Sequence, residues 1–598
     1  MKLNISTILT GCGLGAMVAL QSCSLDEYNP GGFDIDNIAT STTGYEYIIN
    51  QCYFGLERGF YNTTDFMKFT EANSDLWTSK TNTTGEDDHF FRYYAKAPRQ
   101  DYTNTFWNAA YDGIGGCNIA IRDASLAPFA TEAERNEKVA EAYFLRSLYY
   151  YHLVEMFGGV VLTDENTTIT TYSPERTQPI DIYAKMVIPG FRFAVEWLPK
   201  GDDTFDGRPT KKAALGFLAK ACLATQQYGT TEFLQEGQEA ALKLITDCEN
   251  GGSTYGAYMY PTFDEVFKES NNKTNKEALW KYSINEKGAS LGNHKLNQND
   301  QHFMCQLNHF GARIFGTEES IKAWDGGQAG SFMPTQYLLS LFVQADGSLD
   351  PRFHKSFITE WNANNAYSWS EGDCSLYGKA ASKKDTPIAV GDPAIKIVMP
   401  QDPDYDTEIA NKANSNYLLV DYKDVYDDAS KSIIMKKGEG ENNYRYFYPS
   451  LNKHCSTNYY DANKKKNRFG NKNAILVMRM AEIYLIAAEY DILLNGGGKA
   501  MGYINKVRQR AGANQLSGVA DIRTVIDERG RELCGEFTRL YDLKRTGLLK
   551  DDSYLRSTHP EIAEYFNANY VLRPVPQNYT DLIVNGDLFT NPGYSSSK

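Results

Sequence analysis

Hydrophobic residues recur at three- and four-residue steps near the C-terminal end of the chain and predict three helices there. The first covers residues 479–494, and Asn495 with three glycines follows it as a stop signal. The second covers residues 499–511, and the third begins near Asp521, a typical N-cap residue. The inward positions of the first helix are Met480, Ile483, Tyr484, Ala487 and Leu494. Two such helices joined by a glycine turn form a helical hairpin, the unit of helical repeat folds.

The same periodicity runs through the N-terminal half of the chain. Helices are expected over residues 44–56, 141–162 and 182–199, the last with a proline inside it. Residues 207–224 predict an alanine-rich helix, and residues 236–248 predict its antiparallel partner. Within these segments we expect Trp107 and His152 to lie in the core. The repeated hairpins predict a mainly α fold, with a tetratricopeptide-like helical-hairpin scaffold that lacks a consensus period.

Between residues 251 and 473 the helical pattern weakens, while Asn, Gly, Asp and aromatic residues become frequent. This segment is too long to be one loop, so we expect a large irregular, loop-rich insertion with short strands and helices. The predicted division of the chain is a leader at 1–22, a helical region at 23–250, the irregular region at 251–473, and a C-terminal helical region with its tail at 474–598.

Charged residues are dense in the C-terminal helices. Paired carboxylates could serve acid–base catalysis, but the alternation of Arg and Glu at helical spacing favours ion pairs that lock helices together. No His or Ser nucleophile is interleaved with them. The residues are Glu482, Glu489, Arg508, Arg510, Glu528, Arg529, Arg531, Glu532, Glu536, Arg539, Asp542, Lys544 and Arg545.

Three motifs in this region resemble those of the SusD/RagB family. They read R-x-AE-x-YL-x-x-AE from Arg479, IN-x-VR-x-RAG up to Gly512, and ER-x-x-EL-x-GE-x-x-R-x-YDL-x-R from Glu528. The tail adds LRPVPQN (572–578) and NPGY (591–594), with Thr590 as a small departure before the latter. The resemblance implies a surface lipoprotein that captures glycans for a TonB-dependent (SusC-like) outer-membrane transporter.

The N-terminus supports that resemblance independently. A short basic start precedes an apolar stretch at 8–20, which is too short to span a bilayer. It ends in Leu-Gln-Ser before Cys23, the pattern that a lipoprotein signal peptidase cleaves, so we expect acyl chains on Cys23. The alternative is an ordinary secretory signal with an incidental cysteine. The first interpretation predicts a lipid-anchored protein of the outer membrane, exposed at the cell surface.

Composition narrows the class of ligand. The net charge of −14 and a pI near 5.2 argue against nucleic acid as a partner. Aromatic residues make up 13% of the chain, with 41 Tyr, which suits a carbohydrate-facing surface because Tyr combines apolar area with a hydroxyl group. The ten cysteines show no zinc spacing, and their disulfide pairing stays open.

Known catalytic and metal signatures are incomplete, so we expect no enzyme activity, cofactor or metal. G-x-S-x-G and H-E-x-x-H are absent, and GGGK at 496–499 fits a helix turn better than a phosphate loop. Asp402, Asp404 and Asp406 resemble the start of a calcium loop, but Thr407 replaces its glycine, which leaves only an irregular calcium site as an alternative. Three histidines also share a rough spacing but predict ligand or solvent contact rather than metal: His294, His302 and His309.

The resemblance places the ligand site in loops, here residues 77–102 and 298–369. Sugars bind to flat aromatic faces with nearby amides and charges. The candidate ligand residues are Trp77, Asn82, Phe303, His309, Trp324, Trp361 and Trp369. We expect Trp77 to be exposed, because it follows an acidic turn among polar residues. The alternative is that these residues pack the loops; peptide or glycopeptide cargo and a glycoside hydrolase are the rival functions.

Overall fold

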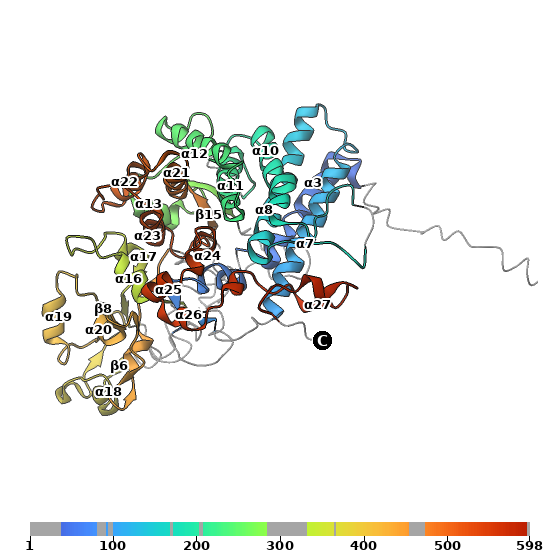
Figure 1. The fold of residues 1–598 in the computed structure, drawn as a ribbon. Coiled ribbons are helices and arrows are strands. Elements are labelled where there is room, and N and C mark those ends of the chain that lie inside the picture. The colour runs from blue at the N-terminus through green and yellow to red at the C-terminus, as the bar shows by residue number, and fades with distance from the viewer. Residues whose placement is uncertain are drawn as a thin grey trace, which may run out of the picture.

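The computed structural model describes residues 38–61, 63–79, 91–93, 100–167, 171–201, 207–283, 332–363, 366–453 and 473–594. Within these ranges the chain is mainly helical, as predicted, with short strands. Figure 1 shows helices arranged along the top and right of the molecule and a smaller lobe at the lower left.

Helices of the N-terminal half pack side by side in chain order. α7 packs on α8, α8 on α10, α10 on α11, and α11 on α12. The elements are α3 (Thr42–Gln51), α4 (Phe54–Gly59), α5 (Thr64–Met67), η1 (Lys68–Ala72), α7 (Gln100–Asp123), α8 (Glu132–Phe157), α9 (Pro179–Ile182), η2 (Tyr183–Val187), α10 (Ile188–Trp197), α11 (Lys211–Ala224) and α12 (Leu234–Glu249).

The C-terminal helices continue this array. α21 (Met480–Asn495) packs against α12, and α22 (Ala500–Ala511) packs against α21, although residues 250–479 separate α12 from α21 in sequence. The hairpin scaffold with a large insertion is therefore confirmed. The remaining helices are α23 (Ile522–Leu533), α24 (Arg539–Arg545), α25 (Asp552–Thr558), α26 (Pro560–Tyr565) and α27 (Gln577–Thr580).

The predicted ends of the C-terminal helices are confirmed by their caps. α21 ends at Gly496 and α22 at Gly512, both in the left-handed region with φ of 73° and 74°. α23 begins after Asp521, whose carboxylate accepts the backbone N–H of Thr524 at 2.7 Å. The GGGK sequence is the turn between α21 and α22, as predicted.

Three helices of the N-terminal half differ from their predicted extent. The predicted helix 44–56 is broken at Cys52 and Tyr53 into α3 and α4. α8 runs from Glu132 to Phe157 and stops at Gly158, whose φ is 74°, so the predicted end at 162 is wrong. The predicted helix 182–199 is divided by the π-helical turn η2. Pro189, which has no N–H to donate, follows this π-helical turn directly, and the helix continues past it.

A short antiparallel pair links the insertion to the scaffold. β2 (Ala278–Tyr282) pairs with β15 (Ile475–Arg479), which leads directly into α21. Gly216 of α11 faces this pair, because a Cβ atom there would lie 2.6 Å from the sulfur of Met478. The absence of a side chain at Gly216 therefore lets α11 approach the strands closely.

The lobe, residues 357–451, begins and ends at one strand pair. β4 (Phe357–Ile358) is antiparallel to β14 (Ser450–Leu451). Inside it, β8 (Pro393–Val398) pairs with β5 (Glu360–Asn362) and with β9 (Leu418–Asp421). Its other elements are β6 (Tyr367–Ser368), α18 (Glu371–Leu376), β7 (Pro387–Ile388), α19 (Tyr405–Asn411), α20 (Tyr422–Val425), β10 (Tyr426–Asp427), β11 (Ser432–Ile433), β12 (Lys436–Lys437) and β13 (Gly440–Glu441). The segment before the lobe holds β3 (Met333–Pro334), α16 (Gln336–Leu341) and α17 (Phe353–Ser356), and α13 (Phe263–Phe267) precedes β2.

The core residues predicted in the N-terminal half are confirmed. Trp107 is buried, and His152 lies between the hydroxyl groups of Tyr61 and Tyr541, each 2.8 Å from one ring nitrogen. Burial lowers the pKa of His152 well below its ordinary value, which keeps the ring neutral. Among the described residues, no helix combines the length and the apolar character needed to cross a membrane.

Candidate functional site

Two short strands bring together the start of one predicted ligand loop and a position inside the other. β1 (Trp77–Thr78) is antiparallel to β3, with Trp77 opposite Pro334 and Thr78 opposite Met333. Residues 80–90 continue from β1, and residues 284–331 return to the described chain at Phe332, directly before β3. We call Trp77, Thr78, Met333 and Pro334 the β1–β3 junction. The structure thus brings together the ends of two segments that are far apart in sequence.

A third segment packs on the same junction. The Phe91 ring contacts the Phe332 ring edge to face, with centroids 5.2 Å apart. Arg92 pairs with Glu561 of α26 at 2.7 Å, and the same carboxylate accepts the Thr78 hydroxyl at 3.1 Å. The junction is therefore held by side chains from the N-terminal, central and C-terminal parts of the chain.

Trp77 is buried at this junction, and the expectation that it is exposed is wrong. Its side chain has 0% exposed surface, and its indole N–H donates to the Glu71 carboxylate at 2.9 Å. Phe332 contacts its ring edge to face. The described polar neighbours of Trp77, from Asn73 to Ser79, are themselves buried, so in this structure Trp77 supports the junction and offers no face to a sugar.

Two acidic residues before Trp77 tie β1 to the C-terminal helices. Glu71 accepts the backbone N–H groups of Gly535 and Thr538, both at 3.2 Å. Asp75 binds Arg539 through two hydrogen bonds of 2.7 Å. The resembled motif GE-x-x-R therefore supports the root of a predicted ligand loop. Sequence reasoning missed this role, although the acidic TEANSD segment beside Trp77 was a visible signal.

Trp361 and Trp369, the two candidates in the lobe, are also buried. Trp361 is 7% exposed on β5, opposite Ile395 of β8. Trp369 has no exposed surface, and its indole N–H donates to the Asn416 carbonyl at 2.7 Å. Both side chains pack the lobe, which was the alternative to a ligand role.

The other candidate residues lie outside the described part of the chain. They are Cys23, Asn82, Phe303, His309 and Trp324, together with His294 and His302. Their assigned roles stay predictions. Phe332 directly follows the segment that carries Phe303, His309 and Trp324, and it contacts Phe91, while the next residue, Arg92, pairs with Glu561.

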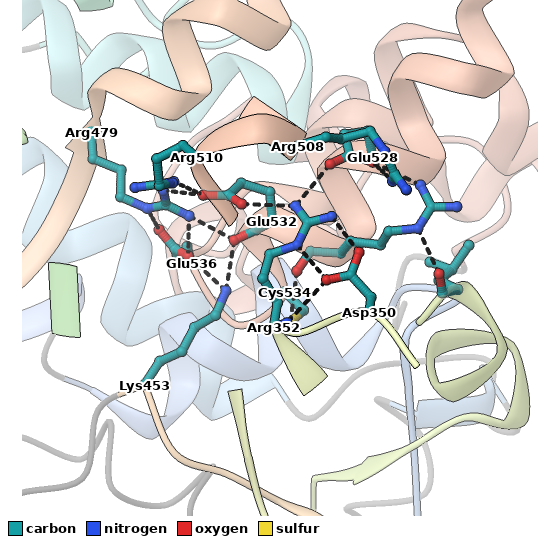
Figure 2. A network of polar contacts seen from close by, with 12 residues as sticks. Asp350, Arg352, Lys453, Arg479, Arg508, Arg510, Glu528, Glu532, Cys534 and Glu536 are labelled. Atoms are coloured by element: carbon teal, nitrogen blue, oxygen red, sulfur yellow. Dashed lines mark hydrogen bonds and ion pairs between the residues drawn. The ribbon is translucent and has the colours of Figure 1, made fainter. Parts of the chain in front are cut away.

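The dense charges of the C-terminal region form a buried ion-pair network, as predicted. We define the C-terminal charge network as Glu277, Asp350, Arg352, Lys453, Arg479, Arg508, Arg510, Glu528, Glu532 and Glu536. Arg352 binds Asp350 at 2.7 Å, Glu528 at 2.8 Å and Glu532 at 2.9 Å. Figure 2 shows Arg352 between Glu532 and Asp350, and Lys453 reaching toward Glu536.

This network does not have the electrostatics of an acid–base pair. Burial alone would raise the pKa of Glu532, but Arg510, Arg479 and Arg352 together hold it well below its ordinary value. The pKa of Glu536 is lowered against burial in the same way, by Arg479 and Lys453. Carboxylates held as anions by several cations are poor proton donors at neutral pH, so the network is structural.

The calcium-like acidic run is engaged in other contacts. Asp404 binds Lys396 at 2.6 Å, and the Asp402 carboxylate contacts His354 at 2.9 Å and accepts the Met399 backbone N–H. In the part of the chain that the structure describes, no group of three or more His, Cys, Asp or Glu residues could hold a metal ion.

Comparisons with known proteins agree with these motifs. A family model described as "SusD family" matches residues 276–594, and one described as "Starch-binding associating with outer membrane" matches residues 34–223. A SusD-like protein P2 of Formosa agariphila is 26% identical over 82% of this chain and 80% of its own length. The starch-binding protein SusD of Bacteroides thetaiotaomicron is 32% identical over 20% of this chain and 21% of its own length.

Solved structures share the fold. Surface glycan-binding protein A of Bacteroides thetaiotaomicron, solved in complex with laminarihexaose, aligns with a TM-score of 0.61 over 93% of this chain and the whole of its own, at 18% identity. At that level of identity the likeness shows the fold alone.

Proposed function

The chain belongs to the SusD family, and we propose that it is a surface lipoprotein that binds an oligosaccharide and delivers it to a SusC-like TonB-dependent outer-membrane transporter. The observation that carries the binding proposal is the β1–β3 junction, where a strand from one predicted ligand segment pairs with a strand from the other. Relatives named for starch binding and for a complex with laminarihexaose support carbohydrate as the class of ligand.

Binding rests on the residues of those two segments. Asn82, Phe303, His309 and Trp324 are the proposed ligand contacts, through ring stacking and hydrogen bonds to hydroxyl groups. The buried Trp77 instead fixes the junction from which they extend. Several aromatic contacts of about 0.5–1.5 kcal/mol each, together with area burial, are compatible with micromolar affinity.

A binding screen tests this proposal. Starch, laminarin, other plant and algal glycans and a set of peptides are measured by calorimetry against the mature protein. We expect a glycan to bind, Trp324→Ala and His309→Ala to weaken it with an unchanged melting temperature, and Tyr172→Ala to leave it unaffected. Tyr172 is a suitable control because it is 73% exposed and its carbonyl accepts the N–H of Val584 in the C-terminal tail. If only peptides bind, the ligand is a peptide and the proposed glycan ligand is wrong. Release of shortened glycan would show that the protein is a hydrolase.

The membrane attachment is tested separately. Cys23 is the proposed acylation site, because it follows the short apolar stretch and small residues of a lipoprotein signal. We expect Cys23→Ala to abolish incorporation of labelled fatty acid and membrane retention. Equal labelling and equal retention in the variant would contradict the anchor without affecting the binding proposal.

A further inference from the structure

Glu71 is a buried carboxyl group at the base of strand β1. Its Oε2 atom accepts the indole N–H of Trp77 at 2.9 Å and the backbone N–H of Gly535 at 3.2 Å. Its Oε1 atom accepts the backbone N–H of Thr538 at 3.2 Å. The residue has 0% exposed surface. These three hydrogen bonds come from neutral N–H donors.

The two elements that meet at Glu71 both have unusual backbone conformations. Glu71 lies in η1, a π-helical turn, and such turns often mark functional positions. The opposing turn between α23 and α24 has φ of 78° at Gly535 and 63° at Phe537, the latter rare for a residue with a side chain. The N–H groups of Gly535 and Thr538 in this turn point at one carboxylate, as N–H groups do in the backbone nests that bind anions. The Glu71 carboxyl group occupies that nest.

The charged and titratable groups around Glu71 are largely engaged with other partners. Arg539 of α24 lowers the pKa of Glu71, but its guanidinium group donates from Nε and one terminal nitrogen to Asp75 and from the other to the Ile526 carbonyl. The charge of Glu71 also acts on the Cys534 thiol, and the His559 ring contacts the Trp77 carbonyl at 3.3 Å. Burial lowers the pKa of His559.

Burial therefore dominates the titration of Glu71. It raises the pKa of Glu71 from 4.5 to about 7, although the N–H donors and Arg539 act in the opposite direction. The charge of this group changes within the range of neutral pH.

We propose that Glu71 is a positioning residue whose charge state couples the Cys534–Thr538 turn to strand β1 and so tunes ligand binding at the β1–β3 junction, an inference that rests on the proposed function. As an anion, Glu71 accepts three charge-assisted hydrogen bonds and fixes β1 against the turn. As a neutral acid, it has an O–H group among N–H donors, so these bonds weaken and β1 is held less firmly. Ligand affinity is higher above pH 7 than below it.

The coupling can be tested without a ligand, by fluorine NMR of protein labelled with 5-fluorotryptophan. The chain has seven tryptophans, and Trp77→Phe assigns the resonance of Trp77. Between about pH 5.5 and about pH 8.5 we expect this resonance to shift with a midpoint near the value that burial gives Glu71. In Glu71→Gln the shift disappears. The Trp280 resonance is an internal reference, because its indole donates to the Gly207 carbonyl.

Glu57→Gln is the matched control. Burial raises the pKa of Glu57 to about 7 as well, but this residue lies on α4, away from the junction. The Trp77 resonance titrates normally in this variant. A Trp77 resonance that does not shift in the wild type overturns the proposal. Persistence of the shift in Glu71→Gln also overturns it and assigns the titration to His559.

Affinity provides the second measurement, with laminarihexaose and maltoheptaose as the probes. Wild-type affinity for the probe that binds falls by about fivefold from pH 8 to pH 6, the low end of typical coupling between two sites. Glu71→Gln shows the weaker affinity at both pH values. If affinity is independent of pH while the Trp77 resonance titrates, the link to binding is overturned. Failure of both glycans and of the wider screen refutes the proposed function and leaves the NMR result as the test of Glu71.

Discussion

The C-terminal charge network and the lobe differ in how their ion pairs meet water, although both use the same residue types. In the network, the side chains of Arg352, Glu528 and Glu532 have no exposed surface. In the lobe, Lys396 binds Asp404 at 2.6 Å and Glu408 at 2.8 Å, but half of the Asp404 side chain is exposed. The exposure of an ion pair, more than the distance between its atoms, therefore decides how much stability the protein loses when the pair is broken.

The reason lies in the cost of separating a buried pair. Each glutamate of the network is bound by two or more cations, so removing one partner leaves the others with no water to replace it. Glu532, for example, is shared by Arg352, Arg479 and Arg510. Water can solvate the lobe pairs directly, which makes each one replaceable.

Glu532→Gln is expected to have the largest effect. The substitution keeps the shape but removes the shared negative charge, and we expect a loss of about 3–5 kcal/mol in the free energy of unfolding. Urea unfolding at neutral pH measures it. Glu239→Gln, on the exposed face of α12, is the control and should be nearly neutral. An unchanged urea midpoint for Glu532→Gln would contradict the claim that buried ion pairs contribute more to stability than exposed ones.

Lys379→Met tests a buried charge within the lobe and should have the next largest effect. The Lys379 ammonium group donates to the Ser415 hydroxyl at 2.6 Å and to the carbonyls of Lys412, Ser415 and Tyr417. Without it these oxygens lose their donor, which costs about 1–3 kcal/mol. Hydrogen exchange should show the loosening at residues 412–417, before the scaffold is affected. A loss as large as that of Glu532→Gln, spread over the whole molecule, would contradict the division into two regions.

Acid should weaken the C-terminal charge network through protonation of Glu532. The pKa of Glu532 is below its ordinary value in the folded protein, so its contribution is present above about pH 4.5 and is lost as the pH falls toward the folded value. With an unfolded pKa of 4.5, one such group loses about 0.8 kcal/mol between pH 7 and pH 4. Wild type should lose this amount more than Glu532→Gln does over the same range. Parallel pH profiles for the two proteins would show that Glu532 is not held as an anion.

The regular elements could be predicted because local sequence determines them. The period of apolar residues located α21, α22 and α23, and Gly496, Gly512 and Asp521 set their ends. The ion pairs were also readable, since Arg and Glu alternate on the same faces. The sequence does not indicate which distant elements these ion pairs join, for example that Arg352 binds Glu528.

The candidate site shows why local reading fails for the loops. Trp77 was expected to be exposed because its neighbours are polar. The described neighbours, from Asn73 to Ser79, are buried, since distant parts of the chain supply partners: Arg539 binds Asp75, and Thr335 donates to the Asp75 carbonyl. Glu71 meets its donors across 464 residues of sequence. A polar residue indicates exposure only when no distant partner can satisfy it.

The smallest loss in the free energy of unfolding is expected for Lys396→Ala. Lys396 binds Glu360, Asp404 and Glu408, yet its acidic partners remain in contact with water when the lysine is removed. We therefore expect a loss of only about 0.2–1 kcal/mol, despite three ion pairs. Because these charges are solvated, about 1 M salt should screen most of the difference between variant and wild type. The loss caused by Glu532→Gln should persist at the same salt concentration, since the network is closed to solvent. A salt-insensitive loss of several kcal/mol for Lys396→Ala would mean that the lobe holds its charges as the network does.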